Sequence, residues 1–137
     1  MSASDFAGTW NFVSSDNFDN YLKQVGVGLV TRKLASNLKP TLVFEIDGDK
    51  WKMSSLSTFK NIVTEFELDK EFDETTGDGR KVKSTFSLKD GKLIQIQKAT
   101  KDSEKDSTFE RYIEGGKLII KMQSDDVVAT RVYEKAQ

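Results

Sequence analysis

Two arginines and a tyrosine near the C-terminal end are the residues of this chain best suited to hold an anion. Arg131 and Tyr133 are two positions apart in the run Val127–Glu134, so on a β-strand both side chains point to the same face. Arg111 lies in an earlier run of the same kind, Ser107–Glu114. A guanidinium beside a phenol hydroxyl offers positive charge and several hydrogen-bond donors, which suits a carboxylate. Whether they form a site depends on whether they point into the protein or into water.

Alternation along the strands predicts the direction of Arg111 but not that of Arg131. In the earlier run Arg111 shares a face with Phe109 and Ile113, while the opposite face is acidic, so we expect Arg111 to point inward. Both faces of the last run carry apolar residues, so a surface arginine packed beside the tyrosine is an equal interpretation there. If both arginines point inward, no carboxylate is evident on the same faces to neutralise them. Such an interior keeps water or accepts an anionic ligand.

The composition excludes much catalytic chemistry and several classes of partner. The chain has 137 residues, most simply one domain over residues 1–137, and contains neither His nor Cys. We therefore expect no enzyme and no metal or other cofactor, because the usual bases, nucleophiles and zinc ligands are missing. The formal net charge of −1 argues against nucleic acid as a partner. No secretory signal and no long apolar run is evident, so we expect a cytoplasmic monomer.

The elements that must position these residues are short strands separated by turns. Runs rich in β-branched and aromatic residues alternate with Gly and Asp turn signals. The expected strands are Thr9–Ser15, Thr41–Asp47, Lys50–Ser57, Thr58–Leu68, Glu71–Thr75, Arg80–Leu88, Lys92–Ala99, Ser107–Glu114, Lys117–Ser124 and Val127–Glu134. This pattern predicts an all-β, antiparallel up-and-down sheet that closes or folds over, because open edges invite aggregation. The low hydrophobic fraction of 36% favours a thin shell around a partly wet interior.

Residues 17–38 have helical spacing instead and interrupt the strands after the first one. Phe18, Tyr21 and the apolar positions that follow recur at helical intervals, with Asp16 or Asn17 as the expected N-cap. Two glycines then break the run, and a second helical stretch ends before the single proline. We expect two short helices joined by a tight turn.

Short motifs along the chain have a specific order and spacing. They are Gly8-Thr9-Trp10-Asn11-Phe12, Asn17-Phe18-Asp19-Asn20-Tyr21-Leu22, Gly26-Val27-Gly28, Thr31-Arg32-Lys33, Lys39-Pro40-Thr41, Ser57-Thr58-Phe59-Lys60-Asn61, Glu71-Phe72-Asp73-Glu74-Thr75, Asp78-Gly79-Arg80-Lys81-Val82-Lys83-Ser84 and Thr130-Arg131-Val132-Tyr133-Glu134-Lys135. Together they resemble the intracellular lipid-binding protein family, in particular the fatty-acid-binding proteins of the heart-muscle, adipocyte and myelin group and their invertebrate members. The resemblance covers essentially the whole chain. It implies a ten-stranded antiparallel β-barrel (a β-clam) capped by a helix–turn–helix between the first and second strands.

The resemblance also implies a function for the arginines and the tyrosine. In relatives that bind carboxylated ligands, two arginines and a tyrosine inside the barrel hold the ligand head group, and the matching positions are Arg111, Arg131 and Tyr133. The match implies the inward direction that alternation left open for Arg131. The implied function is reversible, non-covalent binding and intracellular transport of a long-chain fatty acid such as palmitate or oleate. Retinoic acid or another hydrophobic carboxylate is the alternative ligand.

Further positions are implied to line the ligand tail or the portal. Phe59 matches a portal residue that meets the tail. Phe18 matches an apolar residue under the cap, where packing of the helix on the barrel is an equal interpretation. Asp78 and Arg80 match the portal-side turn, where a purely structural function is equally reasonable. Trp10 matches a tryptophan that packs near the closed end.

The chain departs from the family pattern at two places, and its helical cap carries net positive charge. The loop between Gln97 and Thr108 is longer than in the vertebrate muscle type, and we expect an exposed hairpin end. Trp51 stands where an aliphatic residue is expected, and it either narrows the cavity or lies on the surface. Residues 17–39 carry four basic residues against one acidic residue. This basic cap either contacts anionic membranes transiently, as in a membrane-surface lipid-exchange protein, or is an ordinary solvated face.

Overall fold

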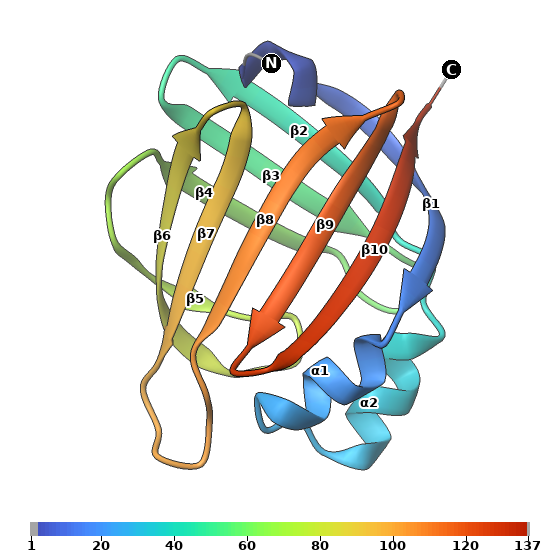
Figure 1. Ribbon diagram of the computed structural model, residues 1–137, viewed down its shortest axis with the longest axis vertical. Coiled ribbons are helices and arrows are strands. Elements are labelled where there is room, and N and C mark those ends of the chain that lie inside the picture. Colours follow the sequence, from blue (N-terminus) through green and yellow to red (C-terminus); the bar gives the residue numbers. More distant parts are fainter. Residues whose placement is uncertain (1–2, 137) are drawn as a thin grey trace.

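The computed structural model describes residues 3–136 and contains ten strands and two α-helices (Figure 1). A short 3₁₀ helix, Ala3–Phe6, precedes them. In chain order the elements are β1 Gly8–Asp16, α1 Phe18–Gln24, α2 Leu29–Ser36, β2 Thr41–Asp47, β3 Lys50–Leu56, β4 Ile62–Glu67, β5 Phe72–Thr75, β6 Lys81–Lys89, β7 Lys92–Ala99, β8 Ser107–Glu114, β9 Lys117–Ser124 and β10 Val127–Lys135. The all-β class and the ten expected strands are thus confirmed.

The strands form one antiparallel sheet that curls into a nearly closed barrel (Figure 1). The order is β4-β3-β2-β1-β10-β9-β8-β7-β6-β5, so the first and last strands of the chain pair with each other. The register of β1 against β10 shifts between Phe12 and Ser14, where β1 bends. β4 and β5 are the two ends of this strand order, and no ladder joins them in residues 3–136. The barrel therefore has one seam.

The start of β4 differs from the sequence prediction. The strand was expected from Thr58 but begins at Ile62. A local turn occupies the intervening residues, in which the Ser57 hydroxyl accepts a hydrogen bond from the Lys60 amide at 3.1 Å and donates to the Lys60 carbonyl at 2.8 Å. A serine hydroxyl that satisfies nearby backbone groups competes with strand pairing, and here the turn prevails.

The predicted helix–turn–helix is confirmed and covers one end of the barrel (Figure 1). Asn17 is the N-cap of α1, but its side chain makes no capping hydrogen bond. Its side-chain nitrogen Nδ2 donates instead to the Val128 carbonyl on β10 at 2.9 Å. Asn17 therefore occupies the expected N-cap position, but its side chain does not bond the first turn of the helix as an N-cap residue usually does. At the turn between the helices Gly26 has a φ of 104°, and Val25 is fully buried. The cap is thus anchored both to β10 and by its own turn.

Aromatic side chains fill the interior on one side of the barrel. Trp51 is 2% exposed, and its ring centroid lies 5.8 Å from those of Phe6 and Phe66. The surface alternative for Trp51 is therefore wrong, and the residue packs in the core. The Trp10 indole donates to the Phe6 carbonyl at 2.9 Å, so Trp10 also has a packing function.

The β7–β8 loop is mostly exposed, as expected, but its middle reaches the cap. The Ser103 carbonyl oxygen lies 3.2 Å from the position that a Cβ on Gly26 would occupy. Asp106 ties the base of the loop, because its carboxylate accepts from the Ala99 amide at 2.8 Å and its carbonyl from the Ser124 hydroxyl at 2.7 Å. The long loop therefore supports the turn between α1 and α2.

Candidate functional site

Two adjoining cavities lie under the helical cap. The inner cavity, of about 210 Å³, is lined by side chains from both walls of the barrel and from α1. The outer cavity, of about 230 Å³, lies toward α2 and the β3–β4 loop. Phe18, Arg131 and Tyr133 line both cavities, so the two are continuous around these side chains.

Arg131 and Tyr133 point into the barrel from β10. They are 6% and 3% exposed, which resolves the direction that strand alternation left open. The Arg131 guanidinium carbon lies 4.9 Å from the ring centroid of Phe12 and 4.3 Å from that of Phe18. Its Nη1 donates to the Ser15 hydroxyl at 3.2 Å. Two aromatic faces and one hydroxyl therefore hold the cation in place, while it still faces the cavity.

Arg111 points inward from β8, as alternation predicted, and has fewer partners. It is 5% exposed, and its guanidinium carbon lies 5.5 Å from the ring centroid of Phe86 and 5.0 Å from that of Phe109. Its Nε and Nη1 have no hydrogen-bond partner among the described residues. Burial lowers the pKa of Arg111 to about 10, which still leaves it charged at neutral pH. The wall of the cavity therefore carries a cation with unused donors.

Glu74 overturns the expectation that no carboxylate lies near the inward arginines. It lines the inner cavity from β5, and its Oε1 accepts hydrogen bonds from Ser84 Oγ at 2.8 Å, Gln95 Nε2 at 3.1 Å and Gln97 Nε2 at 3.2 Å. Its charge is the main factor that opposes the lowering of the Arg111 pKa. Glu74 shares parity with Phe72 along β5, but four residues are too few for alternation to identify an inward face.

Asp78 lines both cavities, but its oxygens are engaged within the turn after β5. Asp78 Oδ2 lies 2.6 Å from Arg80 Nε, and Oδ1 accepts from Arg80 Nη2 at 3.1 Å and from the Thr76 hydroxyl at 3.0 Å. The two charged side chains are 11% and 7% exposed. Arg80 also lines the inner cavity, so both matched residues of this turn lie on the cavity wall. A turn function is thus evident for Asp78, in addition to its place on the cavity wall.

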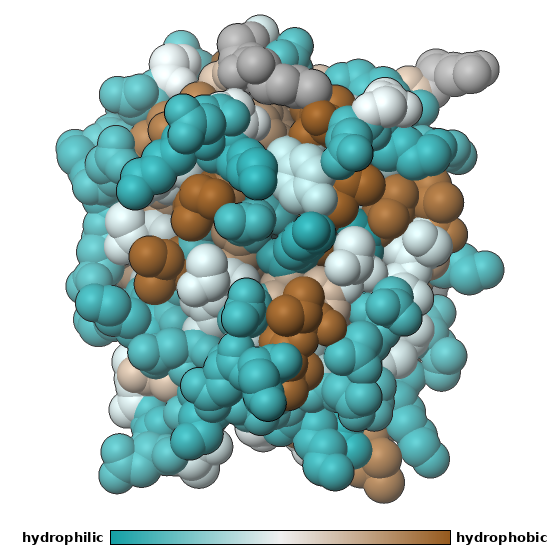
Figure 2. Space-filling model, viewed as in Figure 1, coloured by the Kyte–Doolittle hydropathy of each residue, from teal (hydrophilic) through white to brown (hydrophobic). Residues whose placement is uncertain are grey.

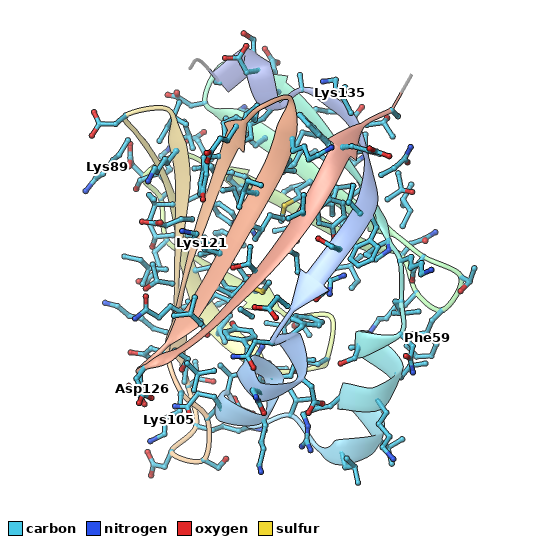
Figure 3. All side chains as sticks on the ribbon, turned by 45° about the vertical axis from the view of Figure 1, so that its right-hand side comes forward. Phe59, Lys89, Lys105, Lys121, Asp126 and Lys135 are labelled. Carbon is cyan, nitrogen blue, oxygen red and sulfur yellow. The ribbon has the colours of Figure 1, made fainter. Side chains whose placement is uncertain are left out.

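Phe18 and Phe59 lie at different depths below and beside the cap. Phe18 is half-buried, stacks on Tyr21 at a centroid distance of 6.4 Å, and lines both cavities. Phe59 lines only the outer cavity and is 59% exposed. Figure 3 shows Phe59 on the loop beside α2. Phe18 therefore packs the helix and also forms part of the cavity wall, whereas Phe59 lies on the solvent side of the outer cavity.

The charges that line the inner cavity do not cancel. Three cations face two carboxylates there, namely Arg80, Arg111, Arg131, Glu74 and Asp78. Asp78 and Arg80 pair directly with each other, so the remaining group has two cations and one carboxylate. A buried excess charge is costly, and one ligand carboxylate would neutralise it. The site is therefore suited to a monoanionic, largely apolar molecule.

Comparison with known proteins places this fold and cavity in one family. Residues 7–136 match the model of the lipocalin / cytosolic fatty-acid binding protein family. The chain belongs to this family. Fatty acid-binding protein homolog 5 of Caenorhabditis elegans is 53% identical over 133 residues, which cover 97% of this chain and 98% of that relative. The resemblance to invertebrate fatty-acid-binding proteins noted in the sequence is thereby confirmed.

Solved structures of family members superpose closely on this one. The apo form of lipid binding protein 8 from Caenorhabditis elegans is 38% identical, with a TM-score of 0.95 and 99% of both chains covered. A fatty acid binding protein from Schistosoma mansoni, solved in complex with arachidonic acid, is 36% identical, with a TM-score of 0.92 and both chains covered in full.

Within residues 3–136 no group of three or more His, Cys, Asp or Glu side chains is arranged to hold a metal ion. No helix in that range combines the length and the apolar character needed to cross a membrane.

Proposed function

We propose that this protein binds a long-chain fatty acid reversibly and without covalent chemistry in its internal cavity, and that it transports the acid within the cytoplasm as a monomer. The observation that carries the proposal is the excess positive charge on the wall of an otherwise largely apolar inner cavity. Family membership supports it, as does the arachidonic acid in the structure of the Schistosoma mansoni relative.

The head group and the tail contribute in different ways. Arg131 and Tyr133 contact the ligand carboxylate directly in this proposal, and Arg111 acts through water. A tail of roughly 16 carbons contributes on the order of 10 kcal/mol at about 0.8 kcal/mol per methylene, before the cost of ordering. The tail therefore supplies most of the affinity, and the cations supply orientation and the preference for an acid.

Entry proceeds past the cap in this proposal. The outer cavity is lined by α2 and by Phe59 and Lys60 of the β3–β4 loop, and it adjoins the head-group residues. The seam between β4 and β5 is less suitable, because the hollow outside it shares no lining residue with either internal cavity. Outward movement of α2 and the β3–β4 loop would therefore open the shortest path to Arg131.

The test is a displacement titration with a fluorescent fatty acid and oleate as the competitor. An Arg131→Gln, Tyr133→Phe double variant should bind oleate more weakly by about 100-fold or more, because it loses at least two hydrogen bonds to a charged group, each of which contributes about 1.5–3 kcal/mol. Tyr112→Phe is the matched control, since Tyr112 lies on the opposite face of β8 beside Lys92 and Lys121. Unchanged oleate affinity in the double variant would sink the head-group assignment.

The same residues suit other hydrophobic acids, so the ligand class needs its own experiment. Parallel titrations with palmitate and all-trans retinoic acid separate a fatty-acid carrier from a retinoid carrier. We expect palmitate to bind more tightly, in line with the similarity to fatty acid-binding protein homologues of Caenorhabditis elegans. No catalytic step is proposed. A stoichiometric lipid recovered chemically unchanged after incubation is the expected result.

A contact with anionic membranes is a second proposal, favoured by the surface of α2. Leu29 and Val30 are 55% and 83% exposed at its start, and the exposed Lys33 follows in the same helix, whereas Arg32 is paired with Asp19 within the cap. Figure 2 shows hydrophobic side chains at the foot of the helical cap, on an otherwise mostly hydrophilic face. Transfer of a fluorescent fatty acid to vesicles with anionic lipid should be faster than to zwitterionic ones, and should slow with salt. Salt-insensitive transfer would count against this contact.

A further inference from the structure

A cluster of polar side chains on the wall formed by β5 to β8 is separate from the head-group residues of β10. Its centre is Glu74 Oε1, which accepts three hydrogen bonds, and Gln95 Nε2 also donates to Ser84 Oγ at 2.8 Å. These contacts determine the orientation of both glutamine amides, because turning either one over would place its oxygen against the carboxylate. The amide oxygens of Gln95 and Gln97 must therefore point away from Glu74.

This cluster contains both hydrogen-bond donors and hydrogen-bond acceptors that have no partner among the described residues. Gln95 Oε1 and Gln97 Oε1 are buried acceptors without a partner, and Arg111 Nε and Nη1 are buried donors without one, within the described residues. The three side chains are 1%, 4% and 5% exposed. Leu93 pairs with Arg111 and Gln95 with Phe109, so Gln95 and Arg111 are diagonal neighbours on the inward face of adjacent strands. Unpaired donors and acceptors thus lie close together on one wall of the inner cavity.

The chemistry of these groups selects among the substituents that an acyl chain can carry. A hydroxyl group both donates and accepts, so it can satisfy an amide oxygen and a guanidinium N–H together. A ketone or an epoxide only accepts, and a methylene does neither. In the absence of such a ligand, water has the same dual character and is the natural occupant. The group that best replaces that water is therefore a hydroxyl on the ligand chain.

We propose that Glu74, Gln95, Gln97 and Arg111 form a subsite for a hydroxyl group on the acyl chain, and that hydroxylated long-chain fatty acids are preferred ligands. The proposal rests on the proposed function, because it assigns the ligand carboxylate to Arg131 and Tyr133. Both groups of residues line the same inner cavity, so one bent chain can reach the two of them. Glu74 remains the internal partner that orients the amides.

The experiment compares stearic acid with a positional series of monohydroxystearic acids by displacement titration. In a plain apolar cavity every hydroxyl weakens binding, because it is buried without a partner. With the subsite present, at least one position should bind about threefold or more tightly than stearic acid, and the other positions should bind more weakly. Gln95→Met keeps the length of the side chain and removes the amide. In this variant the preferred isomer should bind about tenfold more weakly than in the unaltered protein, while stearic acid changes little.

Gln123→Met is the matched control, because this exposed glutamine on β9 bonds only the Asp125 carbonyl among the described contacts. It should leave the whole series unchanged. Thermal unfolding checks that each variant folds, and Gln97→Met replaces Gln95→Met if the latter does not.

The outcomes are distinguishable. If every hydroxy acid binds no more tightly than stearic acid to the unaltered protein, or if the preference survives in Gln95→Met, the hydroxyl subsite is wrong and fatty-acid binding stands. If stearic acid and the hydroxy acids all fail to bind, the proposed function itself fails.

Discussion

Replacing Arg111 should make the ligand-free protein more stable and weaken its binding of an acid. The side chain is 5% exposed, two of its nitrogens have no hydrogen-bond partner in residues 3–136, and burial lowers its pKa. A buried cation that lacks a full set of partners destabilises the folded state. An apolar side chain in its place packs against the surrounding residues without that cost. Arg111→Met removes the charge and retains most of the apolar stem between Phe86 and Phe109.

The magnitude follows from the pKa. A lowering from 12.5 to about 10 corresponds to roughly 3 kcal/mol against the charged form in the folded state. Loss of the two cation–π contacts removes about 1 kcal/mol of stabilisation, and Glu74 loses a facing cation. We expect a net gain of about 1–2 kcal/mol in the free energy of unfolding, or roughly 3–8 °C in Tm.

The assay is urea unfolding of delipidated protein, followed by oleate titration of the same preparation. Arg111→Met should unfold at higher urea and bind oleate about tenfold more weakly, so stability and affinity move in opposite directions. Lys121→Met removes an exposed cation from β9 and should change stability by no more than about 0.5 kcal/mol. A lower unfolding midpoint for Arg111→Met, with the control unchanged, would refute the argument that this cation is uncompensated.

Three further predictions concern the turn after β5, the cap and its buried tyrosine. Asp78→Ala leaves Arg80 buried and unpaired and should cost about 3–5 kcal/mol in urea unfolding, most of which Asp78→Ala, Arg80→Met should recover; equal losses in both variants would contradict this. Gly26→Ala should lower Tm more than Gly48→Ala. Both glycines have positive φ, but only at Gly26 would the new Cβ meet a backbone oxygen, at 3.2 Å. Equal losses of Tm would mean that the β7–β8 loop moves aside without cost. Burial raises the pKa of Tyr21 above 10.0, so its hydroxyl contributes stability that is complete below about pH 10 and is lost as pH rises through the folded pKa. The Tyr21→Phe variant should be less stable at neutral pH, because the hydrogen bond to Ser107 is lost. Above about pH 10 its free energy of unfolding should fall less steeply with pH than that of the unaltered protein. An unchanged slope would exclude Tyr21 as the source of the fall.

Most of the fold could be predicted because its signals are local. Alternating side chains and Gly or Asp turns placed nine of the ten strands within two residues of their observed bounds, since strand period and turn chemistry depend on near neighbours. The start of β4 was wrong because the Ser57 hydroxyl satisfies the backbone in a turn, which the apolar pattern does not reveal.

The candidate site was less predictable, because its contacts join residues distant in sequence. Glu74 was not assigned to the interior because β5 has only four residues, too few for alternation to show an inward face. The glutamines of β7 were not recognised as its partners for a related reason, since Glu74 and Gln97 are separated by 23 positions and meet only when β5, β6 and β7 pair.

The sequence by itself determined the succession of strands along the chain, the helical insertion and the absence of histidine and cysteine chemistry, because each depends only on residue types and short spacings. It also determined that Arg131 and Tyr133 share one face. Only the tertiary structure decided which face that is, because barrel closure turns one side of every strand away from water. The same closure placed Glu74 near Arg111 in a cavity that Arg131 also lines, and it left one positive charge unmatched, as only the assembled wall could show.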